Sequence, residues 1–187
     1  MRTTLLTLSP AALLLLASTG TAFAAESGRN AMITIEASIV SATCDVSVTD
    51  RLNLNNHSAG IFTAANTFID TTAQNFDVRL MNCGTPLAEN DTASLLISGS
   101  TLSGGDSNIF NRDNSSNVGV MIKHNGTGNI LQSGESILVG TAGDPPGAGD
   151  FEKSISLSAA LASNTTNKAE IENTTISAPI TFSFVYN

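Results

Sequence analysis

The sequence predicts an all-β protein, a sandwich of two sheets, and three observations support this. Apolar residues alternate with polar ones in short runs, clusters of turn-forming residues separate the runs, and charged residues make up only 13% of the chain. Alternation with a period of two is typical of strands that bury one face. Seven or more such runs, with no helical periodicity between them, favour a sandwich.

The alternation starts at Ile33, after which apolar residues stand at every second position as far as Ile39. Further short apolar runs each predict one strand, and they cover residues 44–48, 52–54, 76–80, 95–97, 118–122, 137–139 and 155–161. The last run places its apolar residues on one face of a strand: Ile176, Ala178, Ile180, Phe182, Phe184 and Tyr186. Pro179 lies inside this run. Because proline has no N–H to donate to a ladder, it predicts an edge on that side of the strand.

The first 24 residues are typical of a secretory signal peptide. A positively charged Arg2 precedes an apolar run at 11–17, and small residues occupy the cleavage-type positions up to Ala24. The apolar run is shorter than the roughly 20 residues that a membrane-spanning helix needs. We therefore expect the chain to be exported and its mature part to form one domain.

The exported part contains two cysteines, Cys44 and Cys83. An even number of cysteines in an oxidising compartment is most simply explained by one disulfide bond, whereas free buried thiols would be expected in the cytosol. In the chain-entropy model, closing a loop of about 40 residues stabilises the folded state by roughly 4 kcal/mol.

The charge distribution argues against nucleic acid as a partner. The net charge is −8, and the 8 lysines and arginines are scattered rather than gathered into a basic stripe. The two histidines, His57 and His124, stand in turn-like contexts without the spacing of a zinc site or a hydrolase motif. We expect solvated loop histidines, no catalytic or metal site and no cofactor.

Four stretches of the sequence resemble the pilins of chaperone-usher fimbriae of the type 1 kind. Residues 33–44 are similar to the family's N-terminal arm and first strand, which end at its first cysteine, and residues 76–83 are similar to the strand before its second. Residues 117–128 resemble the family's central glycine-containing strand and turn. Residues 182–187 resemble its alternating C-terminus with a penultimate tyrosine.

This resemblance implies an incomplete immunoglobulin-like β-sandwich, completed by a donor strand from the neighbouring subunit. It implies three kinds of partner: neighbouring pilin subunits in a homopolymer or mixed fibre, a periplasmic chaperone that fills the groove first, and an outer-membrane usher where subunits are joined. The expected location is a cell-surface fimbrium, reached through the periplasm, that supports cell adhesion.

Carried over to this sequence, the resemblance divides the chain into a signal peptide (1–24), an N-terminal donor-strand arm (25–37) and a pilin domain (38–187). The residues expected to fill the neighbour's groove are Ala31, Ile33, Ile35 and Ala37. The arm is expected to lie outside the core of its own domain. The apolar residues of the final strand, from Ile176 to Tyr186, are expected to be the part that the chaperone recognises.

A secreted carbohydrate-binding β-sandwich module is the alternative function, since it would share the fold, the acidity and the disulfide. Such modules normally present aromatic platforms to sugars, and the chain has no Trp and one Tyr. An enzyme is less well supported still, because no set of nucleophile, base and ligand residues converges in the sequence.

Overall fold

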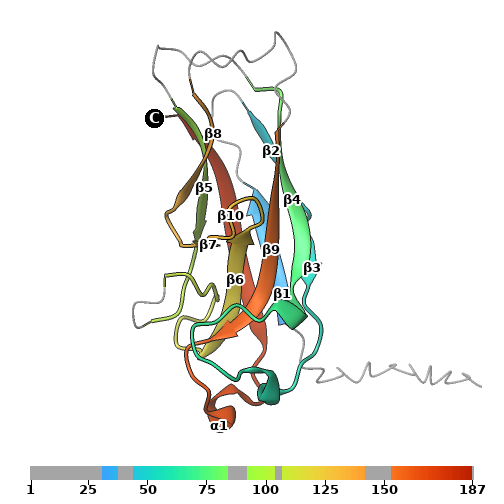
Figure 1. The fold of residues 1–187 in the computed structure, drawn as a ribbon, viewed down its shortest axis with the longest axis vertical. Helices are drawn as coiled ribbons and strands as arrows, with labels where there is room; N and C mark the ends of the chain where they lie inside the picture. Colours follow the sequence, from blue (N-terminus) through green and yellow to red (C-terminus); the bar gives the residue numbers. More distant parts are fainter. Residues whose placement is uncertain (1–30, 38–43, 84–91, 104–106, 142–152, 187) are drawn as a thin grey trace, which may run out of the picture.

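The computed structural model describes residues 31–37, 44–83, 92–103, 107–141 and 153–186, and shows two five-stranded sheets packed face to face (Figure 1). The first sheet has the order β3 (Arg51–Asn53), β1 (Ala31–Ala37), β10 (Ile176–Tyr186), β5 (Thr92–Gly99) and β8 (Ser136–Thr141). The second has the order β2 (Asp45–Ser47), β4 (Gln74–Met81), β9 (Lys153–Ser163), β6 (Val118–His124) and β7 (Ile130–Leu131). The prediction of an all-β sandwich is confirmed. The expected signal peptide and residues 25–30 of the arm lie outside the described residues.

The core between the sheets comes from the predicted alternation. In β4, Phe76, Val78 and Leu80 are buried while the residues between them are exposed. The rings of Phe76 and Phe182 pack across the two sheets at a tilt of 58°, with centroids 6.1 Å apart. Burying an aromatic or aliphatic side chain of this size contributes about 1.5–3 kcal/mol, so this face dominates the stability of the sandwich.

Strands β6 and β9 are buried on both faces near one end, which simple alternation does not predict. A second, smaller apolar cluster explains this: Leu102, Ile109, Met121 and Ala162 pack together, with Phe68 against them. Because Met121 alternates with the core residues of β6, this cluster lies on the outer face of the second sheet. The Nζ of Lys123 lies 4.1 Å from the centre of the Phe68 ring and helps to hold it there.

The elements outside the sheets are short. They are the 3-10 turns Ala59–Ile61 and Asp70–Thr72 and the helix α1 (Lys168–Ile171), whose first turn is capped by Asn167 accepting from the Ala169 N–H at 3.2 Å. Helix α1 lies at the opposite end of the sandwich from the end of β10 (Figure 1). None of the helices in the described residues is long and apolar enough to cross a membrane.

Phe110 is fully buried beside two glycines, Gly99 and Gly119, and a Cβ at Gly99 would lie 3.0 Å from Phe110 Cδ1. Its backbone pairs with Val120 of β6, with N–H to carbonyl distances of 2.8 and 2.9 Å. A Cβ at Gly119 would lie 2.5 Å from the Phe110 carbonyl oxygen and 2.7 Å from Ile109 Cγ2. Both atoms belong to a buried segment that is bonded in place. Gly119 is therefore required by a close approach of backbone to backbone.

We expect Gly119→Ala to destabilise the fold by about 2–3 kcal/mol, since the added methyl forces the Phe110 segment away from β6. Urea unfolding followed by circular dichroism measures the loss. Gly60→Ala is the matched control, because a Cβ there would meet only Ser58 Oγ, at 3.6 Å. Equal midpoints for the two variants would contradict the close approach at Gly119.

Candidate strand-binding groove

The N-terminal strand β1 occupies a slot between β3 and β10. It runs parallel to β10 from the Ala31↔Ile176 pair to the Ala37↔Phe182 pair, and antiparallel to β3 over Met32–Thr34. No other described strand borders β10 on this side. Without β1, one backbone edge of β10 and one edge of β3 would therefore be left unpaired, and the first sheet would be split between them.

The β10 residues on the inner face of the sheet lie along one side of this slot. Ala178, Ile180 and Phe182 are fully buried, and Ile176 and Phe184 are 5% exposed. The side chains predicted to be recognised by a chaperone thus point into the chain's own core. A partner would therefore reach this strand through its free backbone edge and the open groove rather than through outward-facing side chains. The side chain of Tyr186 lies outside the described part of the chain, although its backbone pairs with Ala93.

Residues that share a register position in a parallel pair lie on the same face of the sheet. The partners of Ile176, Ala178, Ile180 and Phe182 on β1 are the four residues predicted from sequence to fill a groove: Ala31, Ile33, Ile35 and Ala37. The structure therefore pairs the four predicted arm residues with four of the six predicted residues of the final strand, and Phe184 and Tyr186 lie beyond the end of β1. Leu52 of β3 is paired with Ile33 on the other side, and no sequence signal had assigned it to this site.

The arm was expected to lie outside its own domain, but here it completes its own sheet. The physical reason is proximity. Only residues 38–43 connect β1 to the body at Cys44, so the local concentration of the arm near its own groove is of millimolar order. An unpaired strand edge beside apolar core residues is a template for strand addition, and a tethered alternating strand is the nearest one available.

Pro179 does not mark an edge of the sheet, because β10 has neighbours on both sides. The carbonyl of Ser177 accepts from the Arg112 N–H at 2.7 Å, which places it on the side away from β1. Backbone groups of residues two apart in a strand point to the same side, so the nitrogen and carbonyl of Pro179 also point away from β1. Along β10, the ladder with β5 begins only at the Ile180↔Gly99 pair, one residue after Pro179. The missing N–H therefore removes no bond from β1 or β5.

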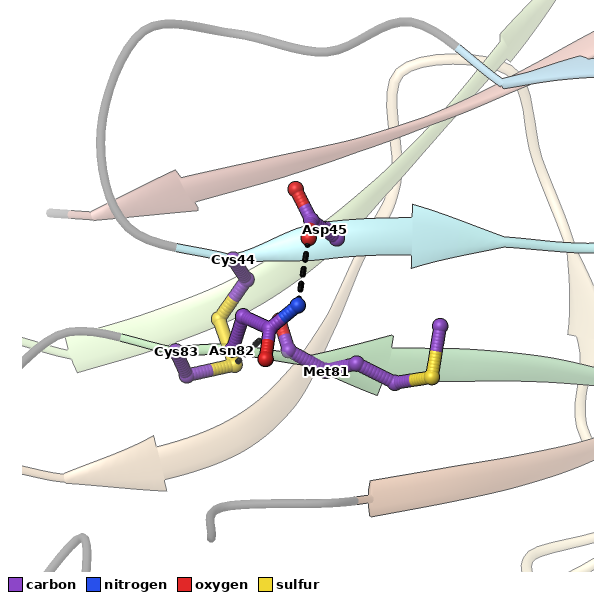
Figure 2. The surroundings of a disulfide bond; sticks show 5 residues. All are labelled: Cys44, Asp45, Met81, Asn82 and Cys83. Atoms are coloured by element: carbon purple, nitrogen blue, oxygen red, sulfur yellow. Dashed lines mark hydrogen bonds between the residues drawn. A yellow bond between two sulfur atoms is a disulfide. The ribbon is translucent and has the colours of Figure 1, made fainter. Parts of the chain in front are cut away.

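The disulfide joins Cys44 and Cys83, as predicted, at the end of the sandwich where β10 finishes (Figures 1 and 2). Cys44 directly precedes β2, and Cys83 follows β4, which is the strand paired with β2. Asn82, in the left-handed region at φ 52°, donates from Nδ2 to Asp45 Oδ2 at 2.7 Å and ties the same two segments together. Cys44, the residue to which the arm is connected, is therefore fixed to the second sheet.

Reduction of the disulfide is expected to lower the free energy of unfolding by roughly 4 kcal/mol, because it releases a loop with a sequence separation of 39. Urea unfolding with and without a thiol reductant measures the difference. The Cys44→Ser/Cys83→Ser double variant should match the reduced protein. An unchanged midpoint on reduction would contradict a stabilising role for the bond.

Both histidines lie in turns and make local hydrogen bonds. The Nε2 of His57 lies 2.7 Å from the Leu54 carbonyl oxygen, and the Nδ1 of His124 lies 2.9 Å from Thr127 Oγ1. Among the described residues, no group of three or more His, Cys, Asp or Glu side chains is placed to hold a metal ion.

Comparison with solved structures identifies the architecture as that of pilus subunits. The chain is similar to the P pilus rod subunit PapA, with a TM-score of 0.55 and 16% identity over 78% of this chain and 100% of that one. It is also similar to a subunit from the structure of a chaperone-usher pilus that reveals the basis of rod uncoiling. That match has a TM-score of 0.53 and 17% identity, and covers 82% of this chain and 93% of the other. No protein-family model and no curated protein match the sequence.

Proposed function

We propose that this chain is a structural subunit of a chaperone-usher fimbria and has no catalytic role. The observation that carries the proposal is the slot between β3 and β10, which is filled by a strand tethered to the body only through residues 38–43. A strand held in this way can be replaced by an equivalent strand from another molecule. Backbone pairing then supplies affinity, and alternate side chains supply register.

In this proposal residues 1–24 direct export, and the Cys44–Cys83 bond forms in the periplasm. A chaperone strand fills the slot beside β10 and is later replaced, at an outer-membrane usher, by the arm of the next subunit. The residues of that arm at the inner register positions are Ala31, Ile33, Ile35 and Ala37. The resulting polymer is a cell-surface fimbrium, which takes part in adhesion as a fibre.

The fold, with its pilus-subunit architecture, supports this proposal over the carbohydrate-binding module. Sugar-binding platforms need exposed aromatic rings. The rings of Phe62, Phe76, Phe110, Phe182 and Phe184 are at most 6% exposed. Phe68 is covered by Lys123 on one face. Within the described residues no aromatic platform faces solvent.

Co-expression with a cognate periplasmic chaperone and outer-membrane usher, in a host that lacks fimbriae, tests the proposal. Electron microscopy should show fibres, and the isolated fibres should contain this chain. If the chain accumulates in the periplasm as a monomer that neither binds the chaperone nor polymerises, the proposed function is wrong. A glycan-array screen of the same protein tests the alternative.

A further inference from the structure

The turn that follows β6 contains Asn125 and Gly126, the only Asn-Gly pair in the sequence. Glycine has no side chain to hinder the approach of its backbone nitrogen to the amide carbon Cγ of the asparagine before it. Both residues are exposed, so water reaches them. The turn therefore meets the first requirement of a site at which an asparagine reacts with its own main chain.

The backbone nitrogen of Gly126 is not engaged by the fold. No described residue accepts a hydrogen bond from its N–H, whereas the N–H of Asn125 donates to the Ser156 carbonyl oxygen at 3.0 Å. An amide nitrogen attacks a carbonyl carbon only as it loses its proton, so the reaction is accelerated by a base beside the N–H.

The ring of His124 is placed to act as that base. A Cβ built on Gly126 would lie 3.3 Å from Cε1 and 3.6 Å from Nε2 of this ring, so the imidazole lies directly beside the glycine. The other ring nitrogen, Nδ1, lies 2.9 Å from Thr127 Oγ1, which also accepts from the Asn129 N–H at 3.3 Å. When Thr127 accepts from Nδ1–H, the lone pair of the ring is on Nε2, the ring nitrogen nearer to Gly126.

The side-chain amide of Asn125 is held by β9 at both of its polar atoms. Its Nδ2 donates to Ser156 Oγ at 3.0 Å, and its Oδ1 accepts from Ser158 Oγ at 2.5 Å. The Ser158 hydroxyl also lies 2.6 Å from Asn75 Oδ1, and because it has one proton, it donates to Asn125 when the Asn75 amide is turned to donate to it. Ser158 is 4% exposed. A buried hydroxyl that donates to Oδ1 polarises the Cγ carbonyl and stabilises the negative charge that develops on Oδ1 during attack.

We propose that Asn125 is a self-modification site, at which the folded chain converts this asparagine to aspartate or isoaspartate with water as the only co-reactant. The Gly126 N–H gives its proton to His124 while the Gly126 nitrogen bonds to Asn125 Cγ. The Cγ–Nδ2 bond then breaks, and Nδ2 takes that proton and leaves as ammonia. Water adds to either carbonyl of the cyclic imide that remains and opens the ring, and no electrons are transferred.

The two products differ in the main chain. Opening at Cγ leaves an aspartate at residue 125, and opening at the backbone carbonyl leaves an isoaspartate, whose main chain passes through Cβ. Either product adds one negative charge to an exposed turn, and no group at the site reverses the change. The modified fraction of a population of subunits therefore grows with time after folding. The inference goes beyond the proposed function, since it needs only the folded chain.

Incubation of the purified folded chain at neutral pH in isotopically labelled water, followed by peptide mapping in a mass spectrometer, tests the inference. The peptide that contains residue 125 should lose ammonia, gain the label and appear as two isomers. Asn129 is the internal control, because it is exposed and near in sequence but precedes Ile130. Conversion in the folded chain should be about tenfold faster than in a synthetic peptide of residues 122–130, which has the same sequence without the contact to Ser158.

Two variants test the assisting groups, with circular dichroism as the check that each is folded. His124→Gln and Ser158→Ala should each slow the conversion of Asn125 by about tenfold. If Asn125 stays as intact as Asn129, or converts no faster in the folded chain than in the peptide, the inference is wrong. Faster conversion in Ser158→Ala would also overturn it, because the serine would then protect Asn125. None of these results depends on whether the chain forms fibres.

Discussion

Ile33→Asp is expected to abolish fibre assembly while leaving capture by the chaperone intact. In the proposed fibre, this position faces the inner side of a groove that is bordered by β10, where Ala178 and Ile180 are fully buried. An ionised carboxylate placed there without a partner costs about 3–5 kcal/mol or more. In the proposed pathway, by contrast, the chaperone fills the groove with its own strand and does not need the arm. The measurement is a chaperone pull-down beside fibre counts by electron microscopy.

Thr34→Asp is the matched control for this variant. It adds the same charge one residue along, at the outer register position, where the β3 partner is Arg51. Fibres should form from this variant at near-normal numbers. If Thr34→Asp is as defective as Ile33→Asp, or if Ile33→Asp assembles normally, the assignment of the inner face of the arm is wrong. Ile35→Asp should reproduce the Ile33→Asp result.

Phe182→Asp is expected to remove the subunit before assembly begins. Phe182 is fully buried and packs against Phe76 across the two sheets. Replacing it loses about 3–5 kcal/mol of packing and adds the cost of a buried charge, a total comparable to the whole stability of a domain. Both chaperone capture and fibres should be lost, and immunoblots of the periplasm should show depleted protein.

Ser183→Asp serves as the neighbouring control, since Ser183 is only partly buried and alternates to the other face of β10. The subunit should accumulate and be captured. Normal periplasmic levels of the Phe182→Asp protein would contradict the view that the inner face of β10 belongs to the subunit's own core. Together with Ile33→Asp, this pair separates a defect in donating a strand from a defect in folding.

The sequence predicted strands such as β4 and β10 because each carries its own period of two. Runs such as 76–80 and 176–186 alternate through their whole length, and the structure places strands over both. The disulfide was predictable from the cysteine count and the export signal together. Neither prediction needed knowledge of which strands pair. Local alternation is sufficient to predict a strand, and two cysteines in one oxidising compartment are sufficient to predict the bond.

What alternation could not predict is the partner of each strand. The period of two in residues 31–37 indicates a strand but carries no information about whose groove it enters. Positions 31, 33, 35 and 37 read alanine, isoleucine, isoleucine, alanine from either end, so their order does not indicate in which direction the strand runs either. The burial of β9 on both faces depends on Phe68 and Leu102, which are distant in sequence. The two-residue strand Ile130–Leu131 and the single turn of α1 are too short to show any period.

Exchange of the groove strand can be followed directly with a fluorescent peptide of residues 29–37 added to the purified complex of subunit and chaperone. The peptide is expected to displace the chaperone and to stay bound in SDS without heating. A peptide with aspartate in place of Ile33 and Ile35 should do neither. A chaperone complex that ignores both peptides, or that releases its chaperone equally to both, would contradict the claim that this groove is completed by the arm of a neighbour.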